Sequence, residues 1–393
     1  MNLVFVTEAR FHRGSDGLIY SQNGSYGLSL WERYLSVFDK ITVVARVEQT
    51  QNEFPKEYLA QSENISFIEL PYFVGPVQYL KRIRSLQAVI RNSITKESVA
   101  YILRVPGKIG TLYGRELKKR NIPYAVEVVG DPWDVFAPGS VKHILSPLFR
   151  VTGYLNLKKV VSNAAAALYV TKIQLQKRYP VSKEAFTTNA SNVFISDSAF
   201  KEEVKKFDKN KNDKIEMIAI GSLAQMYKAP DVVLKALSKL KQNGVNFHLT
   251  WLGDGIYKEQ MIRLSEELNV QDCVSFLGNI PTGEPVREAL KRSDLFIHVS
   301  RTEGLPRAMV EAMSVGLPCI GSKVGGIPEL LEEKALIPSD NVDVLVNKIH
   351  EFLGSKELMN TQGIRNYNEA KEYSNEILMK RRREFCNEII NRL

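Results

Sequence analysis

Short apolar runs alternate with amphipathic stretches along nearly the whole chain, and this alternation limits the possible folds more than any other feature of the sequence. The apolar runs fit strands that are buried on both faces, and the stretches between them repeat apolar residues at helical spacing. Strands joined by helical crossovers form parallel sheets with helices on both faces. The fold class that we predict is therefore α/β, built from doubly wound, Rossmann-like domains.

The alternation occurs twice, which fits two domains in a chain of 393 residues. Between the halves, residues 208–214 (DKNKNDK) lack apolar side chains and are typical of a linker. We predict a first domain over 1–207, a second over 208–370, and a charged C-terminal helix over 371–393. The expected strands lie at 2–7, 41–46, 65–70, 100–105 and 124–129 in the first half, and at 215–221, 247–253, 274–278, 294–300 and 318–322 in the second.

The positive charge of the chain lies in its first half. Residues 1–195 hold 25 Lys and Arg against 15 Asp and Glu, whereas the remainder holds 28 against 29. A basic half favours an anionic partner such as nucleic acid, a phosphate-bearing acceptor or an acidic membrane face. The alternative is a solvated basic surface that has no specific partner.

Two segments of the first half combine basic with apolar residues, namely 72–94 (YFVGPVQYLKRIRSLQAVIRNSI) and 148–159 (LFRVTGYLNLKK). Amphipathic basic helices lie on anionic membrane surfaces, so these segments favour peripheral membrane contact through the first domain. An ordinary domain helix with a basic outer face fits the same pattern equally well.

The sequence does not indicate metal or disulfide chemistry. Its three cysteines, Cys273, Cys319 and Cys386, lie far apart without a CxxC, and its five histidines show no HxxH or HExxH spacing. No apolar run is long enough to span a membrane, and the first residues lack the basic start of a signal peptide. We expect no bound metal, reduced cysteines and a cytoplasmic location, with any membrane contact peripheral at the inner face of the plasma membrane.

Two glutamates flank a Gly-Leu-Pro turn after a predicted strand. In SRTEGLPRAMVEAM (300–313), Glu303 lies in the loop and Glu311 lies inside the following helix. Ligands of open α/β sheets bind at the carboxyl ends of the strands, where a carboxylate accepts hydrogen bonds from sugar or ribose hydroxyls. The spacing alone fits equally well a helix whose acidic residues complement its dipole.

A second candidate loop follows the strand at 215–221. Gly221 and Ser222 turn the chain, and Lys228 precedes a helix whose free N-terminal N–H groups would bind phosphate. The loop is not a P-loop, because GxxxxGK[ST] is absent, and a lysine at a helix start is usually solvated. Turns after two further strands would let backbone approach a ligand closely; they hold Gly253 and Asn279-Ile280.

The first domain offers fewer candidates. A glycine-rich loop is expected at 11–27, where Gly14 and Gly17 give flexibility to close over an acceptor; it lacks GxGxxG, which disfavours a nicotinamide or flavin dinucleotide. Asp131 follows the strand at 124–129 and is a candidate carboxylate, although Asp-Pro is also common in turns. The chain has no DxD triplet, which argues against a donor held through a divalent metal.

Taken together, these stretches resemble the retaining glycosyltransferases of family 4, which have the GT-B fold. The resemblance covers most of the chain and is strongest over 215–331, where the E-x7-E signature of the family matches Glu303 and Glu311. Gly325-Gly326 and Glu329 also fit. The resemblance implies two domains that face each other across a cleft, with an acceptor on the first, a nucleotide-sugar on the second and a C-terminal helix that packs back on the first.

The resemblance also implies roles for individual residues. Glu303 would face the transferred sugar, Lys228 would neutralise the diphosphate so that no metal is needed, and Glu311 would hold the ribose. Asp131 stands where the family often has histidine, and Ser222 stands where it usually has arginine. The implied catalytic residues are Glu303, Lys228 and Asp131; the donor site comprises Gly221, Ser222, Lys228, Gly253, Asn279, Ile280, Glu303, Gly304, Leu305, Pro306 and Glu311; the acceptor side comprises Gly14, Gly17 and Asp131.

The implied function is transfer of a hexose-type sugar, with retention, from a UDP- or GDP-sugar to a saccharide or lipid-diphosphate-linked acceptor, without a cofactor or a nucleic-acid partner. The products would be surface polysaccharides (capsule, exopolysaccharide, O-antigen) or glycolipids. Two alternatives remain: a nucleotide-sugar epimerase on the same frame, which the E-x7-E pattern disfavours, and a non-catalytic two-domain sugar-binding protein, which the lack of a signal peptide disfavours.

Overall fold

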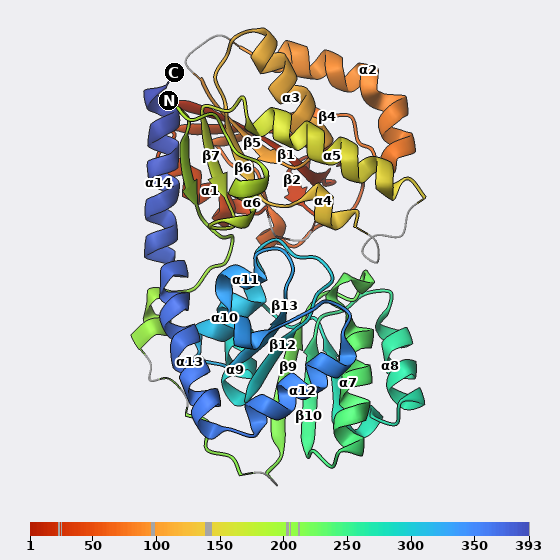
Figure 1. Ribbon diagram of the computed structural model, residues 1–393. Coiled ribbons are helices and arrows are strands. Elements are labelled where there is room, and N and C mark those ends of the chain that lie inside the picture. Colours follow the sequence, from red (N-terminus) through yellow and green to blue (C-terminus); the bar gives the residue numbers. More distant parts are fainter. Residues whose placement is uncertain are drawn as a thin grey trace. The chain divides into compact units, whose positions relative to one another are not determined.

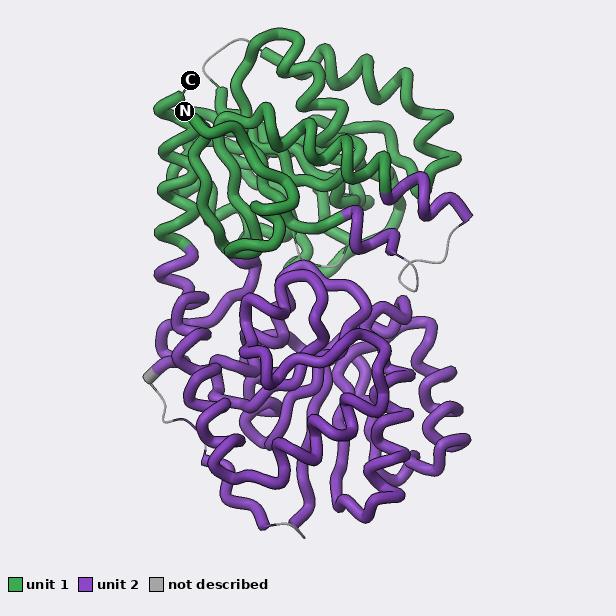
Figure 2. The backbone as a smooth tube through the Cα atoms, viewed as in Figure 1, with its two compact units in different colours: residues 1–131, 151–190, 379–393 green, residues 132–150, 191–378 purple. Residues whose placement is uncertain are grey.

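The computed structural model describes residues 1–393 except 23, 25, 96–98, 138–143, 202–203, 205, 211–212 and 393. The chain forms two compact units (Figure 2). Unit 1 holds Met1–Asp131, Val151–Ala190 and Met379–Leu393, and unit 2 holds Pro132–Arg150 and Ser191–Leu378. The domain boundaries expected from the sequence stay predictions.

Unit 1 is built on an eight-stranded sheet in the order β4-β3-β1-β5-β6-β7-β8, with β2 paired to β1 (Figure 1). The pairings along this order are parallel, and β2 runs antiparallel to β1. Its strands are β1 (Asn2–Arg13), β2 (Ile19–Ser21), β3 (Lys40–Gln49), β4 (Ile65–Leu70), β5 (Val99–Val105), β6 (Ala125–Val128), β7 (Ala166–Tyr169) and β8 (Phe186–Asn189).

Helices cover both faces of this sheet. Buried side chains of α2, α3 and α5, among them Leu86, Tyr113 and Val160, share one core with one face of the strands. On α1, Trp31 packs edge-on against Phe5 of β1, with ring centroids 5.3 Å apart. The helices and 3-10 turn of unit 1 are α1 (Leu28–Leu35), η1 (Lys56–Tyr58), α2 (Gly75–Ser93), α3 (Lys108–Lys119), α5 (Ser146–Val161) from Val151 onward, α6 (Gln174–Arg178) and α14 (Asn375–Asn391) from Met379 onward.

The glycine-rich loop expected at 11–27 is wrong in part. Strand β1 continues to Arg13, and β2 folds back on it with Phe11 opposite Ser21. Phe11 and Ile19 are fully buried, so the polar residues around them form a hairpin that is closed by an apolar core. Gly14 and Gly17 lie in the hairpin turn, where the Gly17 N–H donates to the Gly14 carbonyl at 3.0 Å. Residues 23 and 25 of the expected loop lie outside the described residues.

Unit 2 contains a fully parallel six-stranded sheet in the order β11-β10-β9-β12-β13-β14. Its strands are β9 (Ile215–Ile220), β10 (Phe247–Leu252), β11 (Val274–Gly278), β12 (Leu295–His298), β13 (Cys319–Ser322) and β14 (Leu336–Ile337). Counted from β9, this is the order 3-2-1-4-5-6 of doubly wound sheets. In such sheets successive strands are added on one side of the first strand and then, from the fourth strand, on its other side. The loops after β9 and β12 therefore diverge at the edge where such sheets bind ligands.

Helices and single 3-10 turns connect these strands, as the apolar spacing predicts, and the α/β fold class is confirmed. The helices and 3-10 turns of unit 2 are α4 (Pro132–Val135), η2 (Asp197–Lys201), η3 (Met226–Lys228), α7 (Pro230–Gln242), α8 (Lys258–Glu267), η4 (Gln271–Cys273), α9 (Glu284–Arg292), α10 (Arg307–Ser314), α11 (Ile327–Leu330), η5 (Glu333–Ala335), α12 (Val342–Leu353), α13 (Lys356–Ala370) and η6 (Lys371–Tyr373). None of the helices within the described residues is long and apolar enough to cross a membrane.

Candidate functional site

The candidate site lies where the loops after β9 and β12 diverge. Lys228 ends the turn η3, and Ala229, with a left-handed φ of 52°, directs the chain into α7. Gly221 at the end of β9 makes room for the lysine, because a Cβ there would lie 2.8 Å from Lys228 Cγ. The Lys228 side chain thus passes across the end of β9 and reaches the loop after β12.

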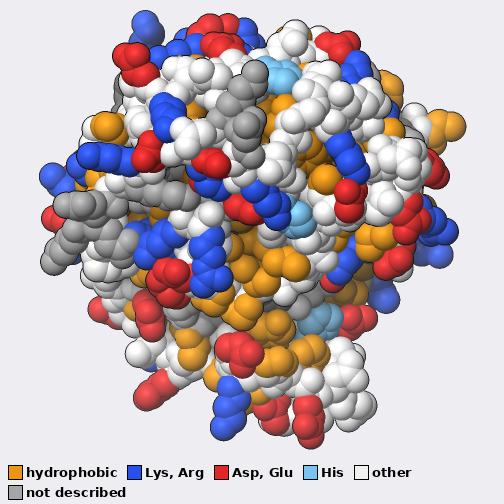
Figure 3. All heavy atoms as spheres, turned by 90° about the horizontal axis from the view of Figure 1, so that it is seen from below, with side chains coloured by type: hydrophobic (Ala, Val, Ile, Leu, Met, Phe, Trp, Pro, Cys, Tyr) orange, Lys and Arg blue, Asp and Glu red, His pale blue; other side chains and the backbone are white. Residues whose placement is uncertain are grey.

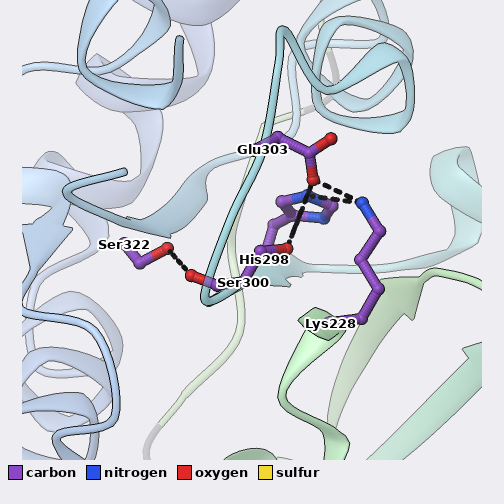
Figure 4. A network of polar contacts seen from close by, with 5 residues as sticks. All are labelled: Lys228, His298, Ser300, Glu303 and Ser322. Atoms are coloured by element: carbon purple, nitrogen blue, oxygen red, sulfur yellow. Dashed lines mark hydrogen bonds and ion pairs between the residues drawn. The ribbon is translucent and has the colours of Figure 1, made fainter. Parts of the chain in front are cut away.

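Glu303 receives three polar side chains on a single oxygen (Figure 4). Lys228 forms an ion pair with Oε2, His298 Nε2 lies 3.0 Å from the same atom, and the Ser300 hydroxyl donates to it at 3.3 Å. Within the described part of the chain, Oε1 accepts no hydrogen bond, and Figure 4 shows it directed away from the cluster. One carboxylate oxygen is therefore fixed while the other is free to accept a hydroxyl.

The charges in this cluster follow from burial and from Lys228. Burial alone would raise the pKa of Glu303, but the positive charge of Lys228 and the hydrogen bond from His298 lower it to about 2. Burial lowers the pKa of His298, and the charge of Lys228 lowers it further. At neutral pH Glu303 is ionised and His298 is neutral. Because an ionised carboxylate only accepts hydrogen bonds, His298 donates through Nε2.

The backbone of the Glu303 loop is held by a close glycine contact. Gly325, with φ of +50°, lies so near that a Cβ there would collide with the Glu303 carbonyl. The N–H of Gly326 donates to the Gly304 carbonyl at 2.6 Å. Leu305 and Pro306 are buried, and Pro306 precedes the first residue of α10. These contacts hold the backbone of the loop in place and so fix the direction of Glu303.

Arg301 ties the two loops of the site together. Its guanidinium donates to both carboxylate oxygens of Asp231 on α7, at 3.0 and 2.8 Å, and to Asp340 at 2.7 Å. The same side chain donates to the Met226 carbonyl at 2.6 Å, and the Arg301 N–H donates to the Tyr227 carbonyl at 2.7 Å. Since η3 carries Lys228, these contacts fix the lysine relative to Glu303.

Glu311 differs from Glu303 in its contacts and in the direction of its pKa shift. It lies in α10, half-buried, and its carboxylate has no hydrogen bond or ion pair among the residues that the structure describes. Burial raises its pKa, although nearby Arg307 opposes the shift. The N-terminus of α10 has no side-chain cap either. Hydroxyl or phosphate groups of a ligand would satisfy these groups.

The remaining donor-side candidates lie at the same edge of the sheet. Gly253, with φ of +135°, follows β10 and packs against the Gly221 carbonyl so closely that no Cβ fits. The Ser222 hydroxyl accepts from the Ala224 N–H at 3.2 Å and caps the turn. Asn279, which is exposed, and Ile280 come directly after β11.

The acceptor-side candidates belong to unit 1. Asp131 is buried after β6, and its two oxygens accept from the Tyr179 hydroxyl and from Arg178, which forms an ion pair with it. Gly14 and Gly17 lie in the β1–β2 turn.

The sequence did not reveal the side chains that support Glu303. His298 appeared only as one of five scattered histidines, and Ser300 and Arg301 were not singled out. A weak signal was present, because His298 is the one polar residue of the buried strand Leu295–His298 and ends it at the ligand-binding edge.

The family model described as "Glycosyl transferases group 1" matches residues 200–369. Over 381 residues the chain is 32% identical to protein CapJ of Staphylococcus aureus, which covers 94% of this chain and 92% of CapJ. The chain belongs to the group 1 glycosyltransferases.

Two further similarities concern a part of the sequence and the overall fold of this glycosyltransferase. It is 34% identical over 124 residues to the amylovoran biosynthesis glycosyltransferase AmsK of Erwinia amylovora, which is 30% of each chain. The structure of Anabaena HepE in complex with UDP matches the whole of both chains with a TM-score of 0.66 and 14% identity. This likeness confirms the GT-B fold that the sequence predicts.

Proposed function

We propose that this glycosyltransferase moves a hexose-type sugar from a UDP- or GDP-sugar to a saccharide or lipid-diphosphate-linked acceptor, with retention and without a metal. Its products would be surface polysaccharides or glycolipids. The Lys228–Glu303 cluster carries the proposal; it lies at the carboxyl edge of the unit 2 sheet, where the strand order reverses between β9 and β12. The name of AmsK and the UDP bound to HepE support the product class and the donor class.

The positive charge needed by a leaving diphosphate would come from the chain itself. Lys228 carries three N–H donors and gives one to Glu303. Within the described part of the chain, the N-cap residues of α7 and α10 provide no side-chain cap, so the free N–H groups and dipoles of these helices favour phosphate. Preorganised donors of this kind stabilise charge that develops in the transition state.

Glu303 would act as an ionised acceptor and not as an acid. With a pKa of about 2 it holds no proton near neutral pH, and its free Oε1 would accept from a hydroxyl of the transferred sugar. Glu311, unpaired and half-buried, would accept from the two ribose hydroxyls.

The reaction would proceed by attack on the face from which the diphosphate departs. The acceptor oxygen forms a bond to the anomeric carbon while the bond from that carbon to the phosphate oxygen breaks. The proton of the acceptor hydroxyl passes to a leaving phosphate oxygen. On the acceptor side, Asp131 would orient Arg178 and Tyr179, since both of its oxygens are engaged, and Gly14 and Gly17 would line the approach. Because the proposed donor is a nucleotide-sugar, we place the enzyme in the cytoplasm.

The test is nucleotide release from a panel of UDP- and GDP-sugars, with and without EDTA and with lipid-linked or soluble saccharide acceptors. We expect release that depends on one acceptor and one donor, resists EDTA and yields a product with the anomeric configuration of the donor by NMR. An inverted product or loss of activity in EDTA would contradict the retaining or the metal-free part. A changed donor without release would indicate an epimerase.

A further inference from the structure

Three helices form a layer over one face of the unit 1 sheet, with α3 in the middle. On one side, the Ser93 hydroxyl of α2 lies 2.9 Å from the Tyr113 hydroxyl of α3. On the other side, Arg115 of α3 donates to Asn156 of α5 at 2.6 Å. Their buried residues belong to one core cluster with the strands, so the outer sides of α2, α3 and α5 form a continuous surface, the basic layer.

The basic layer is almost free of acidic residues. Helix α2 carries four Lys or Arg, α3 carries four and α5 carries three, and the one carboxylate among the three helices, Glu116, is paired with Lys119 at 2.8 Å. On the face shown in Figure 3, by contrast, acidic and basic side chains are interspersed. The exposed basic residues of the layer are Lys81, Arg82, Arg84, Arg91, Lys108, Arg115, Lys118, Lys119, Lys158 and Lys159.

Large apolar side chains protrude from the same layer. On α2, Val77 is 66% exposed and Leu80 is 67% exposed, although most side chains of this type are buried in the core. Their spacing places them on one side of the helix with Lys81 and Arg84. On α5, Leu155 is 56% exposed and lies one turn from Val151. The layer thus combines protruding apolar tips with cationic side chains that surround them.

We infer that the basic layer docks on an anionic lipid bilayer. Interfacial helices bury their apolar side chains a few ångströms into the boundary between headgroups and acyl chains, and adjacent Lys and Arg are attracted to anionic headgroups. Nucleic acid would engage the cations but would leave Val77, Leu80 and Leu155 in water. The complementarity of both charge and polarity therefore selects the membrane. The inference goes beyond the proposed transfer and is measured without donor or acceptor.

The experiment is co-sedimentation of the full chain with vesicles of phosphatidylcholine alone or with equal parts of phosphatidylglycerol. We expect binding to the anionic vesicles only, with affinity falling steeply from ~50 to ~500 mM salt. Lys81→Glu/Arg84→Glu should weaken it by at least about tenfold, since each cation near an anionic surface contributes several-fold. Val77→Ser/Leu80→Ser should weaken it severalfold at low salt as well.

Matched controls lie on unit 2. Lys235→Glu/Arg263→Glu makes the same charge change on exposed residues of α7 and α8, and Leu277→Ser/Ile364→Ser removes exposed apolar side chains of β11 and α13. These should bind as the wild type does, and Lys81→Arg/Arg84→Lys should retain binding.

Four results would overturn the inference: no binding to anionic vesicles, equal binding to phosphatidylcholine alone, equal loss in the control variants, or self-association in ultracentrifugation that Val77→Ser/Leu80→Ser abolishes without an effect on vesicle binding. Unchanged melting temperatures of the variants exclude unfolding as the cause of a loss. A loss of vesicle binding with nucleotide release unchanged would separate this surface from the proposed reaction.

Discussion

The two sheets share one strand order around their first strand but treat the helix N-termini at their carboxyl edges in opposite ways. In unit 1, Glu8 of β1 accepts a hydrogen bond from the N–H of Ile109 in the first turn of α3, and Arg46 lies 3.3 Å from its other oxygen. A side chain at Gly107 would collide with Glu8, so the glycine gives the carboxylate its place. In unit 2, no side chain among the described residues is found bonded to the first N–H groups of α10, whose N-cap is Pro306.

The comparison shows what a shared topology fixes and what it leaves open. Both sheets gather helix N-termini, and hence positive potential, at one edge. Unit 1 fills the N-terminus of α3 with a carboxylate of its own chain, whereas unit 2 pairs Glu303 with Lys228 and keeps the N-termini of α7 and α10 available. We expect the first edge to serve stability and the second edge to serve transfer.

The largest effect is expected for Lys228→Ala. Removing the cation takes away charge stabilisation of the leaving diphosphate and should lower kcat by about 10²-fold or more. Steady-state nucleotide release measures this, with Lys235→Ala on the exposed side of α7 as the control. Near wild-type rates for Lys228→Ala would remove the lysine from the mechanism.

Glu303→Gln should lower turnover by roughly tenfold or more while donor affinity changes little, because the charged hydrogen bond to the sugar is lost. The variant also tests linkage. The pKa of Glu303 is lowered to about 2 from 4.5, so its ionised form stabilises the fold above pH 4.5, and this stability is lost as the pH falls through about 2. Urea unfolding across this window should vary less with pH in the variant; an identical pH dependence would refute the pairing.

Glu311→Gln should weaken donor binding by about tenfold, because a charged acceptor for the ribose is lost. The same change should raise the melting temperature of the ligand-free protein. Burial raises the pKa of Glu311, so its stabilising contribution is present at acid pH and is lost as the pH rises through the folded value. Calorimetry with and without nucleotide measures both effects. A lower melting temperature would show that the carboxylate has a partner in the free enzyme.

The smallest effect is expected at the first edge. Glu8→Ala should lower the free energy of unfolding by about 1 kcal/mol, because the N–H of Ile109 loses its acceptor and Arg46 loses its partner. The rise in melting temperature caused by nucleotide should be unchanged. A loss of nucleotide binding in this variant would contradict the assignment of stability to the first edge and transfer to the second.

The sequence predicted most of the framework because buried parallel strands are continuous apolar runs. It missed the hairpin β1–β2, since polar residues and glycines around Phe11 and Ile19 concealed two short buried segments. It also did not reveal the partners of Asp131, because Arg178 and Tyr179 lie about 47 residues further along the chain. Contacts of that range depend on how the strands are ordered in the sheet.

Within the candidate site, the family pattern and the positions after strands predicted Glu303 and Lys228, and the family pattern predicted Glu311. His298, Ser300 and Arg301 were not predicted, because their contribution lies in hydrogen bonds to Glu303 and to the loop that carries Lys228. Such contacts depend on three-dimensional neighbours and leave no spacing in the sequence.

The close approach of Gly325 to the carbonyl of Glu303 has a consequence for mutations at this glycine. Although Gly325 has no functional group, we expect its replacement to damage the site, because even a methyl group would displace the loop. Among random mutants selected for loss of transfer, Gly325→Ala and Gly325→Ser should therefore be found repeatedly, although this residue has no reactive side chain.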